Sequence, residues 1–209
     1  HIGLGIDSFE GVTLLSGLKE KNIYGDGREL NLEINTSSRN TIYSFGIVEP
    51  YIFNRDVDLI YDISFANYDR SSGYSYNLDE FSTNFGFKYA LAENTSHRII
   101  LQYVLKDYSI TSTSASDSIQ KLSGQNADII LDNNINYNDV DSYMRPSQGT
   151  RFAFANTISP ATNDDNGYIK NIINYSKYYP YKKNIFSFKT KFGNITSLQN
   201  KELSVDDKF

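Results

Sequence analysis

A regular alternation of apolar and polar residues runs through the stretch Val57–Asn67 (V-D-L-I-Y-D-I-S-F-A-N). Successive side chains of a strand point to opposite faces, so this pattern predicts a strand with one apolar and one mostly polar face. The apolar set is Val57, Leu59, Tyr61, Ile63 and Phe65, and the other set is Asp58, Ile60, Asp62, Ser64 and Ala66. Two interpretations fit. A soluble sheet would pack the apolar face on a core, whereas a membrane barrel would turn that face to lipid and the polar face to its lumen.

Similar alternation along the rest of the chain predicts about eleven strands. No segment has the period of a long amphipathic helix, and no run approaches the roughly 20 apolar residues of a membrane-spanning helix. The predicted strands are His1–Ile6, Val12–Lys21, Arg28–Asn35, a strand around Tyr43–Ile47, Val57–Asn67, Leu78–Leu91, His97–Ile110, Asn126–Asp141, Thr150–Ser159, Tyr168–Tyr179 and Ile185–Gly193. From Asn194 onward the sequence predicts no strand.

The connections between these strands favour the membrane interpretation. From the fourth strand onward, longer polar loops fall at every second junction, namely Tyr68–Asn77, Thr111–Gln125, Pro160–Gly167 and the tail. In a meander every second connection lies at the same end, and long loops at one end with short turns at the other are typical of outer-membrane barrels. Many strands also approach the ~10 residues of a tilted membrane strand. We therefore expect an all-β fold, a transmembrane antiparallel up-and-down β-barrel, rather than a sandwich.

Composition adds less. The 17 Tyr and 13 Phe suit strands and the aromatic girdles of barrels. A net charge of −5 without a Lys/Arg stripe gives no reason to expect nucleic acid as a partner. The chain has no cysteine, and its two histidines, His1 and His97, lie far apart in the sequence. We accordingly predict no metal site, no cofactor and no catalytic residue.

Four short motifs, in order along the chain, resemble three turns and one later run of the BamA family of outer-membrane-protein assembly factors. They are N-I-Y-G-D-G at 22–27, E-P-Y-I-F at 49–53, R-P-S-Q-G-T-R at 145–151 and E-L-S-V-D-D-K-F at 202–209, the last with Ser204 where the family has proline. The residues that carry the turn motifs are Gly25, Gly27, Pro50, Tyr51, Pro146 and Gly149. We expect their role to be turn geometry.

The resemblance implies that residues 1–209 are the N-terminal part of one outer-membrane barrel domain, about the first 11 of 16 strands. POTRA repeats upstream and the final strands downstream would belong to a longer protein. The implied location is the outer membrane of a Gram-negative bacterium rather than of an organelle. The implied function is the assembly and insertion of outer-membrane proteins, without enzymatic chemistry. The expected partners are outer-membrane lipid, unfolded outer-membrane protein clients and accessory lipoproteins of an assembly complex.

In the family that this sequence resembles, the first barrel strand pairs only weakly with the last, and the seam between them opens to template client strands. The matching residues are Ile2, Gly3, Leu4, Gly5 and Ile6. Gly3 and Gly5 would weaken this strand and ease its release. The alternative is that they are small lumen residues that fit a crowded wall.

The same resemblance assigns the two faces of the wall. The expected lipid-facing residues are Leu59, Tyr61, Ile63 and Phe65, and the expected lumen-facing residues are Asp58, Asp62, Asp128 and Asp132. Two other functions remain open from the sequence. One is an outer-membrane transport pore or two-partner secretion transporter, in which these acids would line a cation-favouring lumen. The other is a secreted β-rich adhesion domain.

Overall fold

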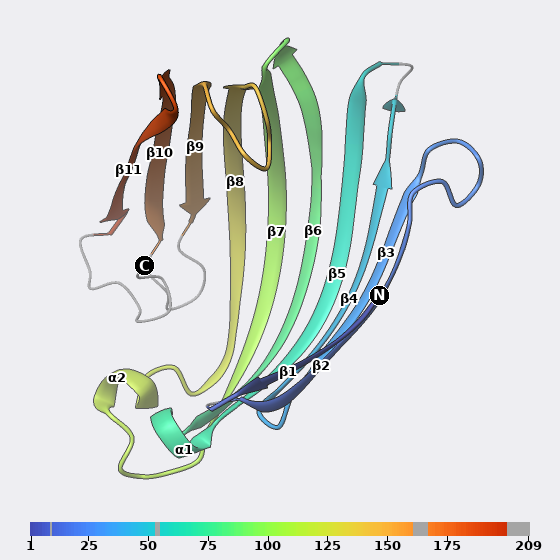
Figure 1. The fold of residues 1–209 in the computed structure, drawn as a ribbon. Helices are drawn as coiled ribbons and strands as arrows, with labels where there is room; N and C mark the ends of the chain where they lie inside the picture. Colours follow the sequence, from blue (N-terminus) through green and yellow to red (C-terminus); the bar gives the residue numbers. More distant parts are fainter. Residues whose placement is uncertain (9, 53–54, 161–166, 200–209) are drawn as a thin grey trace.

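In the part of the chain that the structure describes, eleven antiparallel strands form a single curved sheet in which each strand pairs with the one before it (Figure 1). The computed structural model describes residues 1–8, 10–52, 55–160 and 167–199. The strands are β1 (Ile2–Asp7), β2 (Gly11–Glu20), β3 (Glu29–Thr36), β4 (Asn40–Glu49), β5 (Val57–Arg70), β6 (Tyr76–Ala92), β7 (Thr95–Ile110), β8 (Gly124–Val140), β9 (Gly149–Ser159), β10 (Tyr168–Tyr181) and β11 (Asn184–Ser197). The sheet order is β1 to β11, so these two strands are its edges. The predicted all-β antiparallel meander of eleven strands is confirmed.

Among the described residues, two single-turn helices lie in the connections at one end of the sheet. Helix α1 (Ser71–Tyr74) joins β5 to β6, and α2 (Asp117–Gln120) lies between β7 and β8. Both are at the bottom of Figure 1, whereas the turns after β2, β4, β6, β8 and β10 lie at the opposite end. We call this opposite end the short-turn end, because the two-residue turns after β6 and β10 lie there.

The predicted loop Tyr68–Asn77 is wrong, because β5 continues to Arg70 and β6 already begins at Tyr76. Polar cross-strand contacts carry these strands further: the Asn67 amide donates to Asp79, and Arg70 Nη1 donates to Asn40 Oδ1 at 2.9 Å. The expected difference in loop length is therefore only partial. Residues 111–123 form a long connection, but residues 71–75 form a shorter one than residues 141–148 at the short-turn end.

Strand β11 also runs further than the sequence predicted. It ends at Ser197, beyond Asn194, because its pairing with β10 continues as far as the pair formed by Tyr168 and Ser197. The motif at 202–209 lies outside the described residues.

The register places the alternating side chains in rows that cross the whole sheet. One such row joins Tyr43, Phe65, Phe81 and Leu105, which are directly opposite one another on β4 to β7. Most of the buried strand residues lie on the other face; among them Ile100 and Val104 are each 4% exposed. Because curvature crowds the side chains of the concave side, that other face is the concave one. The face of Tyr43 and Phe65 is the convex, outer face.

A small apolar cluster lies on the concave face and was not predicted. Ile60, Gly86 and Ile100 are opposite one another on β5, β6 and β7. A Cβ at Gly86 would overlap the Ile99 carbonyl oxygen and lie 2.6 Å from Ile100 Cδ1. Glycine at position 86 therefore lets the side chain of Ile100 lie across β6, and Ile60 and Ile100 are both buried.

Candidate functional site: the first strand and the short-turn end

Strand β1 is the edge strand at the N-terminal side of the sheet. It pairs with β2 from the pair Ile2–Ser16 to the pair Asp7–Gly11. The outer-face side chains of Ile2, Leu4 and Ile6 are 79%, 79% and 88% exposed. An edge strand with an exposed apolar face is able to pair with a further strand.

The hydrogen-bond pattern identifies which backbone groups of β1 are directed away from β2. His1 and Gly17 exchange two backbone hydrogen bonds, of 2.7 and 2.9 Å. Such pairs alternate along an antiparallel ladder, so Gly3 and Gly5 are the next residues whose N–H and C=O groups face β2. The N–H and C=O groups of the residues between them, Ile2, Leu4 and Ile6, therefore point to the free edge.

The space around the two glycines of β1 bears on the two interpretations left open by the sequence. A Cβ at Gly3 would lie 3.7 Å from Leu15 Cβ, and one at Gly5 would lie 4.0 Å from Thr13 Cβ. Both are ordinary van der Waals contacts. Crowding within this wall does not require glycine at either position, so the lower strand propensity of glycine is the more relevant property.

The four predicted outer residues of β5 all lie on the convex face. Leu59, Tyr61, Ile63 and Phe65 alternate with concave-face residues, and the Phe65 ring lies 5.0 Å from the ring of Phe81 on β6. Tyr61 and Phe65 are 36% and 55% exposed. A continuous apolar surface therefore follows β5 and its neighbours on this face.

The four predicted lumen acids all lie on the concave face, and each of them has a basic or hydroxyl neighbour. Asp58 is opposite Lys88 in the register. Asp128 forms an ion pair of 3.6 Å with Lys106, and Asp132 accepts a 2.5 Å hydrogen bond from Thr157.

The fourth acid, Asp62, has an oxygen that covers Gly46 of β4, and Arg98 of β7 is near enough to attract its charge. Further along the sheet, the register places Lys170, Lys189 and Lys191 on the same concave face. This face carries both signs of charge and does not form a uniformly acidic lining.

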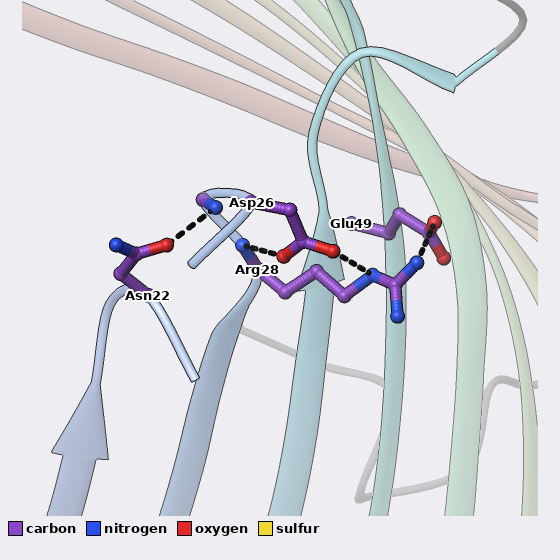
Figure 2. Close-up of polar contacts among 5 residues, drawn as sticks. Asn22, Asp26, Arg28 and Glu49 are labelled. Atoms are coloured by element: carbon purple, nitrogen blue, oxygen red, sulfur yellow. Dashed lines mark hydrogen bonds and ion pairs between the residues drawn. The ribbon is translucent and has the colours of Figure 1, made fainter. Parts of the chain in front are cut away.

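The turn between β2 and β3 is held by its own side chains and by the end of β4 (Figure 2). Asn22 Oδ1 accepts a 2.7 Å hydrogen bond from the Gly27 N–H, and Asp26 accepts one of 3.2 Å from the Arg28 N–H. The Arg28 guanidinium then forms ion pairs with Asp26 at 3.3 Å and with Glu49 at 3.1 Å. The Arg28 side chain therefore bridges two turns.

Two motifs that are separate in the sequence meet at this point. Gly25 and Gly27 have φ values of 81° and 87°, as expected for their turn. A Cβ at Gly27 would lie 3.4 Å from Pro50 Cγ, so this turn touches the start of the β4–β5 connection. The next residue, Tyr51, has a φ of 57° and is 65% exposed.

The turn between β8 and β9, which contains Pro146, is closed by Asp141 and Arg151. The Asp141 carboxylate accepts hydrogen bonds from the Ser147 hydroxyl, from the Ser147 N–H at 2.8 Å and from the Gln148 N–H at 3.2 Å. These hydrogen bonds, led by that of the Ser147 hydroxyl, lower the pKa of Asp141 to about 2. The turn is thus organised around an ionised carboxylate.

Arg151 secures the same turn from β9. Its Nη2 donates to the Tyr143 carbonyl at 2.6 Å and its Nε to Asn138 Oδ1 at 3.1 Å, while the guanidinium lies 5.1 Å from the Tyr143 ring. Gly149 has a φ of 107°, and a Cβ there would overlap the Asp139 carbonyl oxygen. This close approach explains glycine at position 149.

The roles of Arg28, Glu49, Asp141 and Arg151 were missed by the sequence reasoning. Arg151 is part of the third turn motif, and Glu49 directly precedes Pro50. Their positions beside the motifs were a usable signal, but the contact between the first two turns depends on the pairing of β3 with β4.

No helix in the described parts of the chain is long and apolar enough to cross a membrane. Within those same parts, no group of three His, Cys, Asp or Glu side chains is placed to hold a metal ion.

A meander of long tilted strands with an apolar outer face and a polar concave face is the wall of a transmembrane β-barrel. The Omp85 superfamily domain matches residues 22–209, and the chain belongs to this superfamily. A solved structure with a similar fold is that of BamA from Haemophilus ducreyi lacking POTRA domains 1–3, with a TM-score of 0.80 and 20% sequence identity. The match covers all of this chain and 43% of that chain. The resemblance to the BamA barrel is confirmed, and the family places the wall in an outer membrane.

Proposed function

We propose that this wall belongs to a protein that inserts other β-barrel proteins into the outer membrane, and that client strands pair with the free edge of β1. The observation that carries the proposal is the outward direction of the N–H and C=O groups of Ile2, Leu4 and Ile6. These groups are spaced to continue an antiparallel ladder with an incoming strand.

No covalent chemistry is required for this function. An unpaired backbone group costs several kcal/mol in the hydrocarbon of a membrane, so a client strand is stabilised when its ladder is completed at the edge. The exposed side chains of Ile2, Leu4 and Ile6 would extend the apolar surface of the hybrid sheet on the lipid side. Gly3 and Gly5 weaken the strand propensity of β1 and would favour its later release.

We further propose that residues 1–209 form about the first 11 of 16 strands of one barrel domain, preceded by POTRA repeats in a Gram-negative outer-membrane protein. The first eleven strands would then supply the seam strand and the wall beside it. Unfolded outer-membrane proteins would be its clients, and accessory lipoproteins its partners. The ordered turns around Arg28 and Arg151 offer a fixed surface at the short-turn end, which in barrels of this type faces the periplasm.

The seam is tested by tethering. In the full-length protein, a cysteine at position 4 is paired with a cysteine in the strand that closes the barrel against β1. We expect client insertion to stop when the disulfide forms and to return on reduction. The matched control carries Leu4→Cys alone, which should insert clients at the normal rate under both conditions. Undiminished insertion with the crosslink complete would refute the seam mechanism.

A further inference from the structure

A row of four asparagines crosses the outer face of the last four strands. Asn133 on β8 is opposite Asn156 on β9, Asn156 is opposite Asn171 on β10, and Asn171 is opposite Asn194 on β11. We name these four residues the asparagine stripe. The same row continues through β7, β6 and β5 as Ile99, Phe87 and Leu59, so its character changes from apolar to amide at β8.

Three of the four stripe residues lie inside the apolar part of the outer face, and Asn194 lies at its margin, next to Thr196. Each of the three has an apolar outer-face residue two positions away on both sides, and the fourth, Asn194, follows Phe192. The flanking residues are Leu131 and Ile135 on β8, Phe154 and Ile158 on β9, and Ile169 and Ile173 on β10. In a transmembrane barrel this part of the face meets hydrocarbon, where a polar group without a partner is costly.

The strands themselves meet only part of that cost. Asn156 Nδ2 donates a 2.8 Å hydrogen bond to Asn171 Oδ1, as in the amide ladders of stacked strands. A carboxamide has two N–H donors and an oxygen with two lone pairs, so both side chains retain hydrogen-bonding capacity beyond this bond. An isoleucine at either position would remove the cost altogether. The placement of amides here therefore favours a surface that is covered by something other than acyl chains.

We propose that the asparagine stripe is a contact surface between two copies of this protein in the membrane. The stripe carries no formal charge, and its donors and acceptors are equal in kind, so it is complementary to itself. A two-fold axis along the membrane normal beside Asn156 and Asn171 would bring the two amide pairs together. The apolar flanks, such as Phe154 and Ile173, would then pack around a hydrogen-bonded centre. This is the self-matching arrangement that a two-fold interface requires.

This contact would leave the proposed function intact. Strands β2 to β7 separate the stripe from β1, so the client edge stays free in a dimer. The inference rests on the outer face being exposed to lipid, which follows from the family, and it does not require β1 to template clients.

The test is disulfide crosslinking of the full-length protein in native outer membranes. Residues 1–209 contain no cysteine, so Asn156→Cys places the one cysteine of this wall in the stripe. The matched control is Tyr43→Cys, an outer-face residue of β4 that is 52% exposed. We expect disulfide-linked dimers at position 156 at least tenfold more often than at position 43. Equal crosslinking at both positions, or a crosslinked product that contains a different protein, would overturn the proposal.

A second variant separates the interface from folding and from client insertion. Phe154→Cys reports on the same surface with all four asparagines present, and its crosslinking should fall to the control level when Asn156→Leu and Asn171→Leu are added. Leucine suits a lipid-facing position, so we expect the folded barrel to form in normal yield. Its yield is measured by the heat-modifiable migration of the folded barrel on a gel. Client insertion by this variant should equal that of the parent. Unchanged crosslinking would contradict the role of the asparagine stripe as a contact surface. If the parent protein forms dimers but does not insert clients, only the proposed function is contradicted.

Discussion

The Arg28 guanidinium lies 3.1 Å from the Glu49 carboxylate, and this ion pair joins the turn after β2 to the end of β4. Beside it, Gly27 is so close to Pro50 that an added Cβ would contact the proline ring at 3.4 Å. The turn motifs at 22–27 and 49–53, which are separate in the sequence, therefore form one unit.

Removal of the ion pair should cost little. The side chains of Arg28 and Glu49 are 40% and 42% exposed. Exposed ion pairs contribute ~0–1 kcal/mol to the free energy of unfolding. We expect Glu49→Gln to lower the free energy of unfolding by less than about 1 kcal/mol, as measured by urea unfolding of the barrel in detergent. A double-mutant cycle with Arg28→Gln should give a stabilising coupling energy between the two side chains, and this coupling should disappear in high salt. Coupling that persists in high salt would contradict this account.

Backbone conformation should matter more than the ion pair in the same turn. Gly25 and Gly27 both have positive φ, and a left-handed conformation costs a residue with a Cβ about 1–2 kcal/mol. Gly25→Ala, which has open space around it, and Gly27→Ala should therefore destabilise the barrel by similar amounts. Gly27→Asn should recover part of the loss, because asparagine tolerates this conformation. If either alanine variant is as stable as the parent, glycine is not required at that position for a positive φ.

Gly86 provides a stronger test of the packing on the concave face. A Cβ there would overlap a backbone oxygen, which cannot move aside as a flexible side chain can. Overpacking of this kind costs about 1–3 kcal/mol, so Gly86→Ala should lower the yield of folded barrel and its unfolding midpoint in urea. The control is Gly73→Ala in α1, where an added Cβ meets nothing within 4 Å. Unfolding of both variants at the same urea concentration would contradict the close packing of Ile99 and Ile100 against Gly86.

Asp141 predicts a pH dependence for the turn after β8. Its pKa is lowered from 3.8 to about 2 in the folded protein, so the ionised form binds the turn N–H groups more strongly than the protonated form does. The resulting stabilisation is complete above pH 3.8 and is lost as the pH falls toward 2. The amide protons of Ser147 and Gln148 should be protected from hydrogen exchange at pH 5 and lose that protection near pH 2. Asp141→Asn should be less protected at pH 5 and should show no such change.

Much of the fold could be predicted because strand alternation is a local property. Val57–Asn67 was recognised from its own residues, and the structure places its apolar set on the convex face. The predicted loop Tyr68–Asn77 is wrong because polar residues in this part of the chain continue the strands. In the structure, Asn67 and Asp79 are polar residues paired across strands.

The parts that were missed depend on register, which a single strand does not contain. The burial of Ile60 and Ile100 could be predicted only with the knowledge that both are opposite Gly86, on the two strands beside β6. The row of Asn133, Asn156, Asn171 and Asn194 could not be predicted either, because these residues become neighbours only when β8 to β11 are aligned. The motif glycines could be predicted from the sequence, but their contact partners could not.

The most direct measurement of the central claim removes one outward N–H group from β1. Leu4→Pro deletes a donor that points to the free edge, whereas the N–H groups that bond β2 belong to Gly3 and Gly5. Leu4→Ala is the matched control, since it shortens the side chain and keeps the N–H group.

We expect the proline variant of the full-length protein, reconstituted in vesicles, to insert a barrel client at least about fivefold more slowly than the alanine variant. One hydrogen bond is worth ~1 kcal/mol in water and more in lipid. Equal insertion rates for the two variants, with both barrels folded, would contradict the pairing of client strands with β1.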